Sequence, residues 1–224
     1  MRRAAGIRVS SAIGVVAAIT GTALFAVSAF AAGPPAAAET MRFAIVRNGQ
    51  QIGTYAIEIN RKGPEISVAA VTDLTVTVLF VTAYRLQHTE NERWVNGRLV
   101  ALQSTSDDNG TRHSVSATTK GSNLEVTVDG KASLIDPNVM LENFWNPQLL
   151  ARPAMLNTQD GQVTRVSVSD GGEEDLTIND QTVRTHRYTV NSRYSQDVWF
   201  DSQSHLVLTK FQASDGSVIM YIPI

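Results

Sequence analysis

The sequence predicts an all-β domain, a strongly curved antiparallel sheet or open barrel built as a meander with one short helix. Seven Asx-Gly dipeptides punctuate the chain, and runs rich in Val, Ile, Thr, Tyr and Phe lie between them. An Asn or Asp followed by Gly favours type I′ turns, whose positive φ angles match the twist of paired strands. Short strands separated by such turns are typical of meanders and barrels. The dipeptides are Asn48-Gly49, Asn96-Gly97, Asn109-Gly110, Asp129-Gly130, Asp160-Gly161, Asp170-Gly171 and Asp215-Gly216.

The expected strands form two groups, separated by a stretch that does not alternate. The first group is expected near residues 41–47, 51–60, 65–72, 74–95, 98–107, 111–119 and 123–128. The second group is expected near residues 162–168, 173–179, 182–191, 196–201, 206–213 and 217–223. Both groups alternate apolar and polar side chains, as half-buried strands do.

One expected strand, residues 74–95, is too long to remain straight. At about 3.3 Å per residue it would extend about 70 Å, more than a compact domain can hold. Between Val76 and Leu86 both of its faces are apolar. We therefore expect this strand to bend strongly or break at a bulge, and to wrap an apolar interior.

Two of the dipeptide turns also predict how neighbouring strands pair. Extended without a bulge, the turn at Asn96-Gly97 pairs His88 with Thr105, and the turn at Asn109-Gly110 pairs Ser106 with His113. Because side chains alternate between faces, this register places His88 and His113 on opposite faces of the sheet. A single bulge would exchange the faces.

The non-alternating stretch contains a candidate helix. Residues 137–150 read PNVMLENFWNPQLL, with Asp136 as a possible N-cap and Pro137 at the first helical position. A second proline, Pro147, disfavours helix at the residue before it. We therefore expect one short helix near residues 138–146.

The N-terminus predicts export. Three arginines precede an uncharged apolar run over residues 12–30, and Ala29-Phe30-Ala31 fits a signal-peptidase site. The expected organisation is a signal peptide over residues 1–31, an Ala/Pro linker over 32–40 and a single β-rich domain over 41–224. Cleavage at Ala38 and a retained membrane anchor are the alternatives. A periplasmic or secreted protein with no membrane span after cleavage is expected.

Charge and cysteine content exclude several functions. Without the three arginines of residues 1–31, 16 basic side chains stand against 21 acidic ones, a net charge of −5. This balance argues against nucleic acid and anionic membrane surfaces as partners. The chain has no cysteine, which excludes thiol catalysis, cysteine-ligated zinc and iron–sulfur clusters.

Several sequence words carry a family resemblance. They are FVTAYRLQHTENERW (80–94), DDNGTRHSVSA (107–117), NFWNPQLL (143–150), LNTQDG (156–161) and DVWFD (197–201). Together they closely resemble a family of exported bacterial proteins known as domain of unknown function 6134, over residues 43–221. The resemblance implies no activity, substrate or catalytic residue. It implies a β-rich fold similar to the curved sheet of periplasmic lipoprotein carriers, which is an analogy of fold alone.

Three polar clusters are candidates for chemistry. His88, Glu90 and Glu92 form an H-x-E-x-E pattern on one strand face, which suits a divalent metal only if the strand curves. The competing interpretation is a solvated strand end whose acids pair with arginines. His113 follows two aspartates across a turn and could take part in acid–base chemistry. The acidic run 170–175 could attract Ca²⁺, although a solvated turn is the favoured interpretation.

The aromatic and amide residues around the expected helix are the best candidates for a ligand pocket. Aromatic anchors beside neutral amides suit a wall that orients a bound molecule, although a plain core is the favoured alternative. No serine-hydrolase, zinc-protease, P-loop or dinucleotide motif is present. No catalytic residue, metal or cofactor is therefore assigned. The candidate ligand-binding residues are Tyr84, Phe144, Trp145, Asn146, Gln159 and His113.

The sequence therefore favours an exported, non-catalytic binding module for an apolar or amphipathic small molecule. An envelope interaction or assembly protein without a small ligand is the alternative, and the sequence leaves the oligomeric state open. A hydrolase is the third hypothesis, and it requires two or more polar candidates to converge in one cleft. Those candidates are His88, Glu90, Asp108, His113 and Asn146.

Overall fold

The computed structural model describes residues 38–224. The expected signal peptide and most of the expected linker lie outside these residues. The described part contains one 13-stranded sheet in which all neighbours pair antiparallel, which confirms the all-β prediction. Its strands are β1 (Glu39–Arg47), β2 (Gln50–Lys62), β3 (Glu65–Val78), β4 (Val81–Val95), β5 (Arg98–Asp108), β6 (Thr111–Lys120), β7 (Asn123–Val128), β8 (Lys131–Ile135), β12 (Ser167–Ile178), β13 (Gln181–Asn191), β14 (Ser195–Asp201), β15 (Leu206–Gln212) and β16 (Val218–Pro223).

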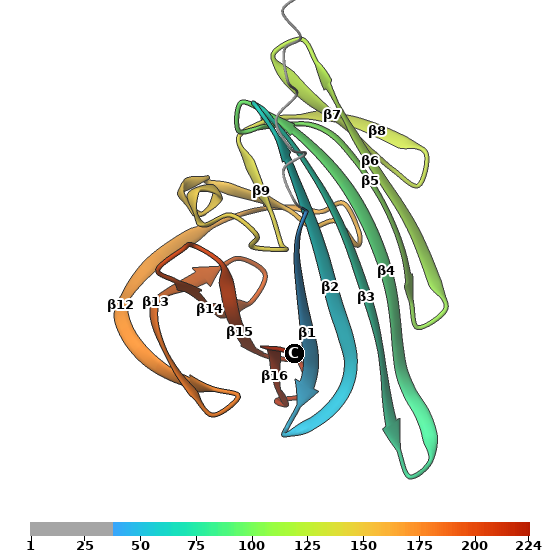
Figure 1. Cartoon of the computed structure of the whole chain (residues 1–224). Coiled ribbons are helices and arrows are strands. Elements are labelled where there is room, and N and C mark those ends of the chain that lie inside the picture. Colours follow the sequence, from blue (N-terminus) through green and yellow to red (C-terminus); the bar gives the residue numbers. More distant parts are fainter. Residues whose placement is uncertain (1–37) are drawn as a thin grey trace, which may run out of the picture. The chain divides into compact units, whose positions relative to one another are not determined.

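The sheet is a meander whose first and last strands meet in the middle. Its order runs from β12 to β16, then from β1 to β8. The junction is the β1–β16 pair, in which Phe43 lies opposite Pro223. The two ends of the sheet, β12 and β8, do not pair, so the sheet is open. Figure 1 shows β12–β15 curling round to face the long wall made by β1–β5.

A small second sheet lies across one end of the space between these walls (Figure 1). It consists of β9 (Val139–Leu141), β10 (Ala154–Leu156) and β11 (Val163–Arg165), with β9 and β10 parallel. A short 3₁₀ helix, η1 (Pro147–Ala151), connects β9 to β10.

The helix predicted near residues 138–146 is therefore misplaced. Residues 139–141 form a strand, and the helical turn begins after Asn146, whose side chain accepts a hydrogen bond from the Gln148 N–H at 3.0 Å. Asn146 and Pro147 thus supply the N-cap and first-position proline that the prediction assigned to Asp136 and Pro137.

Most predicted turns are present, with one clear exception. The first four Asx-Gly pairs, beginning at Asn48, have positive φ at both residues and connect consecutive strands. Asp170-Gly171, in contrast, lies inside β12, where the register with β13 shifts between Asp170 and Gly172. The acidic run is therefore part of a bulged strand, and the chain reverses later, at Asn179-Asp180.

The long segment 74–95 is not one bent strand. It belongs to β3 and β4, which reverse direction at Leu79 and Phe80. Neither residue favours a turn, since both must adopt positive φ there, and no Asx-Gly dipeptide marks this point.

A bulge at Val100 of β5 changes one predicted register. The β4–β5 register shifts between Arg93 and Trp94, so His88 pairs with Ser106 instead of Thr105. The pairing of Ser106 with His113 is confirmed. His88, Ser106 and His113 therefore share one row, and the predicted placement of His88 and His113 on opposite faces is wrong.

The core lies on the inside of the rolled sheet. Alternate residues of the strands point inward, and the small sheet adds Val139–Leu141 and Leu156. On β4 the inward residues are Leu86, His88, Glu90, Glu92 and Trp94, all buried. The predicted solvated strand end is therefore wrong, because the apolar residues at both ends of this row fix its polar members on the same inner face.

Candidate functional site

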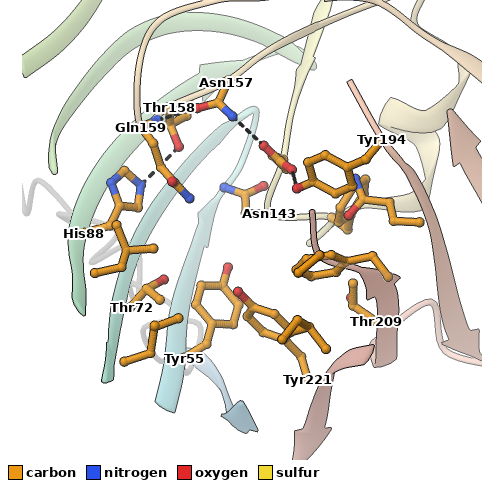
Figure 2. Close-up of a pocket in the computed structure, with 18 of the residues that line it drawn as sticks. Tyr55, Thr72, His88, Asn143, Asn157, Thr158, Gln159, Tyr194, Thr209 and Tyr221 are labelled. Carbon is orange, nitrogen blue, oxygen red and sulfur yellow. Dashed lines mark hydrogen bonds between the residues drawn. The ribbon is translucent and has the colours of Figure 1, made fainter. Parts of the chain in front are cut away.

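A cavity of about 700 Å³ lies inside the roll. One wall comes from β2–β4, the opposite wall from β14–β16, and the segments 142–144 and 157–159 cover its upper end. Figure 2 shows Tyr55 of β2 and Tyr221 of β16, the two strands that flank β1, close together below Asn143.

The cavity has both apolar and polar lining. Its apolar side chains come from both walls, and they include Ile52, Leu74, Leu86, Leu206, Phe211 and Ile219. At the covering segments, its polar end, Figure 2 shows His88, Asn143, Asn157, Thr158 and Gln159 together, while Thr72, Gln196, Thr209 and Gln212 add polar groups elsewhere. An apolar space with a few convergent polar groups is the usual form of a small-molecule site.

The inner row of the sheet holds the covering loop in place. The Ser104 hydroxyl donates to the Thr158 carbonyl at 2.6 Å, and the Ser106 hydroxyl donates to the Gln159 carbonyl at 3.0 Å. His88 bridges both parts, with Nδ1 2.9 Å from the Ser106 hydroxyl and Nε2 3.1 Å from the Thr158 hydroxyl. These bonds satisfy the loop's backbone in a buried setting and fix the roof of the cavity.

Glu92 joins β4 to the segment that precedes η1. Its carboxylate accepts from Trp94 Nε1 at 2.5 Å, from Trp145 Nε1 at 3.2 Å and from the Asn143 amide. The two indoles meet edge to face, with their centroids 5.8 Å apart. Burial, followed by the negative charge of Glu90, raises the pKa of Glu92 to about 8 although the three donors oppose this shift.

Glu90 is the charged partner in this pair. Burial opposes its charge, but the neighbouring His88, Thr158 and Asn143 outweigh burial and hold the pKa of Glu90 below its usual value. Its Oε2 atom lies 3.7 Å from His88 Nε2, and its Oε1 accepts from Asn143 at 3.0 Å. A negative charge is thus held at the wall of the cavity.

A third carboxylate, the partly buried Glu142, links the roof to the opposite wall. It accepts from the Tyr194 hydroxyl and, at 2.8 Å, from the Asn157 amide, as the dashed lines in Figure 2 show. Burial raises the pKa of Glu142 above its usual value, although the Tyr194 bond opposes this. Burial and then the charge of Glu142 raise the pKa of Tyr194, so this phenol keeps its proton and donates.

Several buried polar atoms in the cavity wall have no hydrogen-bond partner among residues 38–224. They include the Tyr55 hydroxyl, Glu90 Oε2, Asn143 Oδ1 and Gln196 Nε2. Burial, with smaller contributions from Glu90 and Glu92, raises the pKa of Tyr55, so its hydroxyl stays protonated. Buried polar groups without partners are uncommon and costly, and here they are gathered around one space.

The comparisons with known proteins were informative about family and fold. The family described as "Domain of unknown function (DUF6134)" matches residues 43–224. The chain belongs to this family. The DUF6134 chain is also similar in structure to a "Beta-barrel-like Protein of Domain of Unknown Function DUF1849 from Brucella abortus", with a TM-score of 0.58 and 7% identity over 81% of this chain and 94% of the other. That likeness shows the fold alone. No curated protein matches the sequence of this chain.

The DUF6134 structure brings together only some of the predicted ligand-binding residues. Tyr84, Phe144 and Gln159 line the cavity. Trp145 is buried beside it, against Glu92 and Trp94, and Asn146 caps η1. His113 lies outside the cavity and pairs with Asp129 at 2.8 Å, and the bond to Asp129 raises the pKa of His113. That these residues bind a ligand stays a prediction.

The convergence required for a hydrolase is met only by His88 and Glu90. Asp108, His113 and Asn146 do not line the cavity. Ser106 lies next to His88, and its hydroxyl hydrogen-bonds the Gln159 carbonyl. The His88 row thus contacts the covering loop through Ser106 and Thr158.

Sequence reasoning missed the most informative site residues of the DUF6134 domain. Glu142 and the unpartnered Tyr55 carried no local signal. Glu90 could have been placed correctly, because Leu86 and Trp94 have the same parity on the strand and both are strongly apolar.

The described residues contain neither a metal-binding cluster nor a membrane-spanning helix. Within residues 38–224, no group of three or more His, Asp and Glu side chains is arranged to hold a metal ion. The same part of the chain has no helix long and apolar enough to cross a membrane.

Proposed function

We propose that this domain binds an amphipathic small molecule in its interior cavity. The observation that carries the proposal is the set of buried, unpartnered atoms at the polar end, Tyr55 Oη, Glu90 Oε2 and Asn143 Oδ1. A ligand that fills the apolar part and offers hydrogen bonds at its polar end would satisfy these atoms, which removes a cost of about 1–3 kcal/mol for each.

The charges around the cavity define the polar end of the ligand. Glu90 is ionised and buried, whereas the lining residue Arg193 is already paired with Asp160 at 2.5 Å. An anionic head group would meet Glu90 with no unpaired arginine or lysine among the lining residues of the described part of the chain to balance it. The ligand therefore carries hydrogen-bond donors at its head, as an amine or a polyhydroxylated group does.

Fluorescence of N-phenyl-1-naphthylamine, a neutral apolar probe, tests cavity binding. The wild-type protein should bind it saturably, and Thr209→Phe should abolish that binding because the ring would fill part of the cavity that Thr209 lines. Thr89→Phe is the matched control, since Thr89 is exposed on the outer face of β4. Probe binding that is absent, or equal in all three proteins, would contradict the proposal.

Competition for the probe tests the head group. Below micellar concentrations, dodecylamine should displace the probe at about tenfold lower concentration than dodecanoate. The ammonium group is attracted to Glu90 and the carboxylate is repelled, and we expect their binding free energies to differ by about 1.4 kcal/mol. Glu90→Gln should remove most of this difference, whereas Glu58→Gln, on the exposed face of β2, should preserve it. Equal displacement by both amphiphiles in the wild type would reject the head-group assignment and leave cavity binding standing.

A further inference from the structure

The β3–β4 hairpin extends beyond both of its neighbouring strands, β2 and β5. The last β3 residue that pairs with β2 is Leu74, and the first β4 residue that pairs with β5 is Leu86. Residues 75–85 therefore form a two-stranded ribbon that projects past the neighbouring strands, as Figure 1 shows. No charged residue occurs between Asp73 and Arg85.

The tip of this ribbon is apolar and fully exposed. Phe80 has a relative exposure of 102% and Leu79 of 88%. The adjoining Val78 and Val81 are also exposed. Burying a large apolar side chain would be more favourable than leaving it exposed by about 1.5–3 kcal/mol, and the exposed cluster does not gain this free energy.

The tip is also conformationally strained. Leu79 and Phe80 have φ of +47° and +66°, a region that costs a bulky residue about 1–2 kcal/mol. The turns between β1 and β2, β4 and β5, and β5 and β6 use Asn-Gly, which adopts this geometry at little cost. Neither stability nor solubility accounts for Leu-Phe at this turn, so we look to an interaction for its role.

We propose that the Val78–Val81 tip inserts into the surface of a lipid bilayer. The tip projects from the sheet, is uncharged and exposes four apolar side chains, which suits a fluid hydrocarbon layer that needs no complementary shape. The absence of charge from residues 74–84 assigns a neutral lipid surface rather than an anionic one.

The backbone of the ribbon limits the depth of insertion. Beyond Leu74 and Leu86 the outer edges of both strands have no neighbouring strand, so their N–H and C=O groups require water. Insertion is therefore shallow, within about 5–10 Å of the headgroup boundary, and Thr77 and Thr82 lie at the polar level. Because Leu74 and Tyr84 also line the cavity, the ribbon continues directly from the cavity wall.

Co-sedimentation with phosphatidylcholine vesicles tests this proposal, with the protein purified from its host cell in the form found there. Replacing the tip with Leu79→Asn and Phe80→Gly should lower the vesicle partition coefficient at least about tenfold, since two large apolar side chains are lost. The same replacement supplies a favoured turn, so thermal stability should be kept or raised. Leu134→Asn, at an exposed apolar residue of β8, is the matched control and should bind as the wild type does.

Three results would overturn the proposal. They are wild-type protein that does not sediment with the vesicles, a tip variant that binds as well as the wild type, and a wild-type dimer that only the tip replacement dissociates. The last result would identify a second copy of the chain as the partner of the tip. The proposal does not require a ligand in the cavity, so its failure and that of cavity binding are distinguished by the separate variants.

Discussion

The inner face of β4 places ionisable groups where most strands of this sheet place apolar ones. His88 supports the covering loop, Glu90 holds a negative charge at the cavity, and Glu92 anchors two tryptophans. Each role depends on burial, which strengthens the hydrogen bonds and also separates the pKa values of two neighbouring carboxyl groups. The row thus fixes local structure and sets the polarity of the site at once.

The raised pKa of Glu92 predicts that stability falls as pH rises. The folded state keeps the proton up to about pH 8, whereas the unfolded chain releases it near the ordinary glutamate value. The stabilisation is therefore complete below about pH 4.5 and is lost as the pH approaches 8. Thermal unfolding at pH 5 to 8.5 should show a falling midpoint in the wild type and less than half that fall in Glu92→Gln.

Glu58→Gln is the control for this pH experiment, because Glu58 lies on the exposed face of β2. Its midpoint should fall with pH as the wild-type midpoint does. Glu142 also has a raised pKa and should cause the residual fall in Glu92→Gln. A wild-type midpoint that rises over this range would mean that Glu92 is ionised in the folded protein.

At the scale of single residues, sequence reasoning found the polar row but placed it on the wrong side of the sheet. The alternation that identifies strands also relates His88, Glu90 and Glu92 to Leu86 and Trp94. The polarity of these three residues favoured a solvent-exposed position. In the structure they are buried, and they are hydrogen-bonded by Asn143 and Thr158, which are distant in sequence. Such contacts depend on tertiary structure, which no local pattern encodes.

At the scale of elements, the close approach of β2 and β3 defines the base of the projecting ribbon. A Cβ atom at Gly53 would lie 2.2 Å from the Asp73 carbonyl oxygen and 2.5 Å from the Leu74 Cβ. Only a glycine fits against this backbone without a shift of one strand. Leu74, which faces Gly53, is the last residue that β2 supports before the ribbon.

Gly53→Ala should therefore destabilise the protein by about 2–3 kcal/mol, as overpacking against backbone does. Denaturation in urea would measure the loss. Thr54→Ala, at the neighbouring exposed position, should change the free energy of unfolding by about 0.5 kcal/mol or less. Equal effects of the two substitutions would show that β2 and β3 separate easily at this point.

Elements were predictable where the turn chemistry was conventional. The strand ends that flank the Asn-Gly turns were located correctly because these dipeptides favour the required φ angles. The turn at Leu79-Phe80 was missed because its residues oppose that geometry. The short strands β8, β9 and β10 were missed because their formation depends on neighbours, and the 3₁₀ turn was displaced to the wrong proline.

At the scale of the whole molecule, the roll is completed by the pairing of β1 with β16. This pair joins the two halves of the meander, and Tyr221 on β16 contributes to the cavity. The aromatic contact between Tyr55 and Tyr221, with centroids 5.7 Å apart, crosses the same junction. The cavity therefore exists only when both halves are joined.

Removal of residues 218–224 should abolish probe binding and cause self-association. The edge of β1 would be left unpaired, and an exposed strand edge pairs readily with other chains. Size-exclusion chromatography with light scattering would detect the oligomers. A chain that lacks only Ile224, which donates one backbone hydrogen bond to Arg42, should remain like the wild type. A monomeric truncated protein would show that β16 is dispensable for closure.

The central position of the β1–β16 pair also has a consequence for the order of folding on the ribosome. β1 is translated before every other strand of the domain, and its partner is translated after every other strand. The hairpins of each half can form as they emerge, because their contacts are local. The seam between the halves must wait until β16 has been translated, so until then the nascent chain keeps the edge of β1 unpaired.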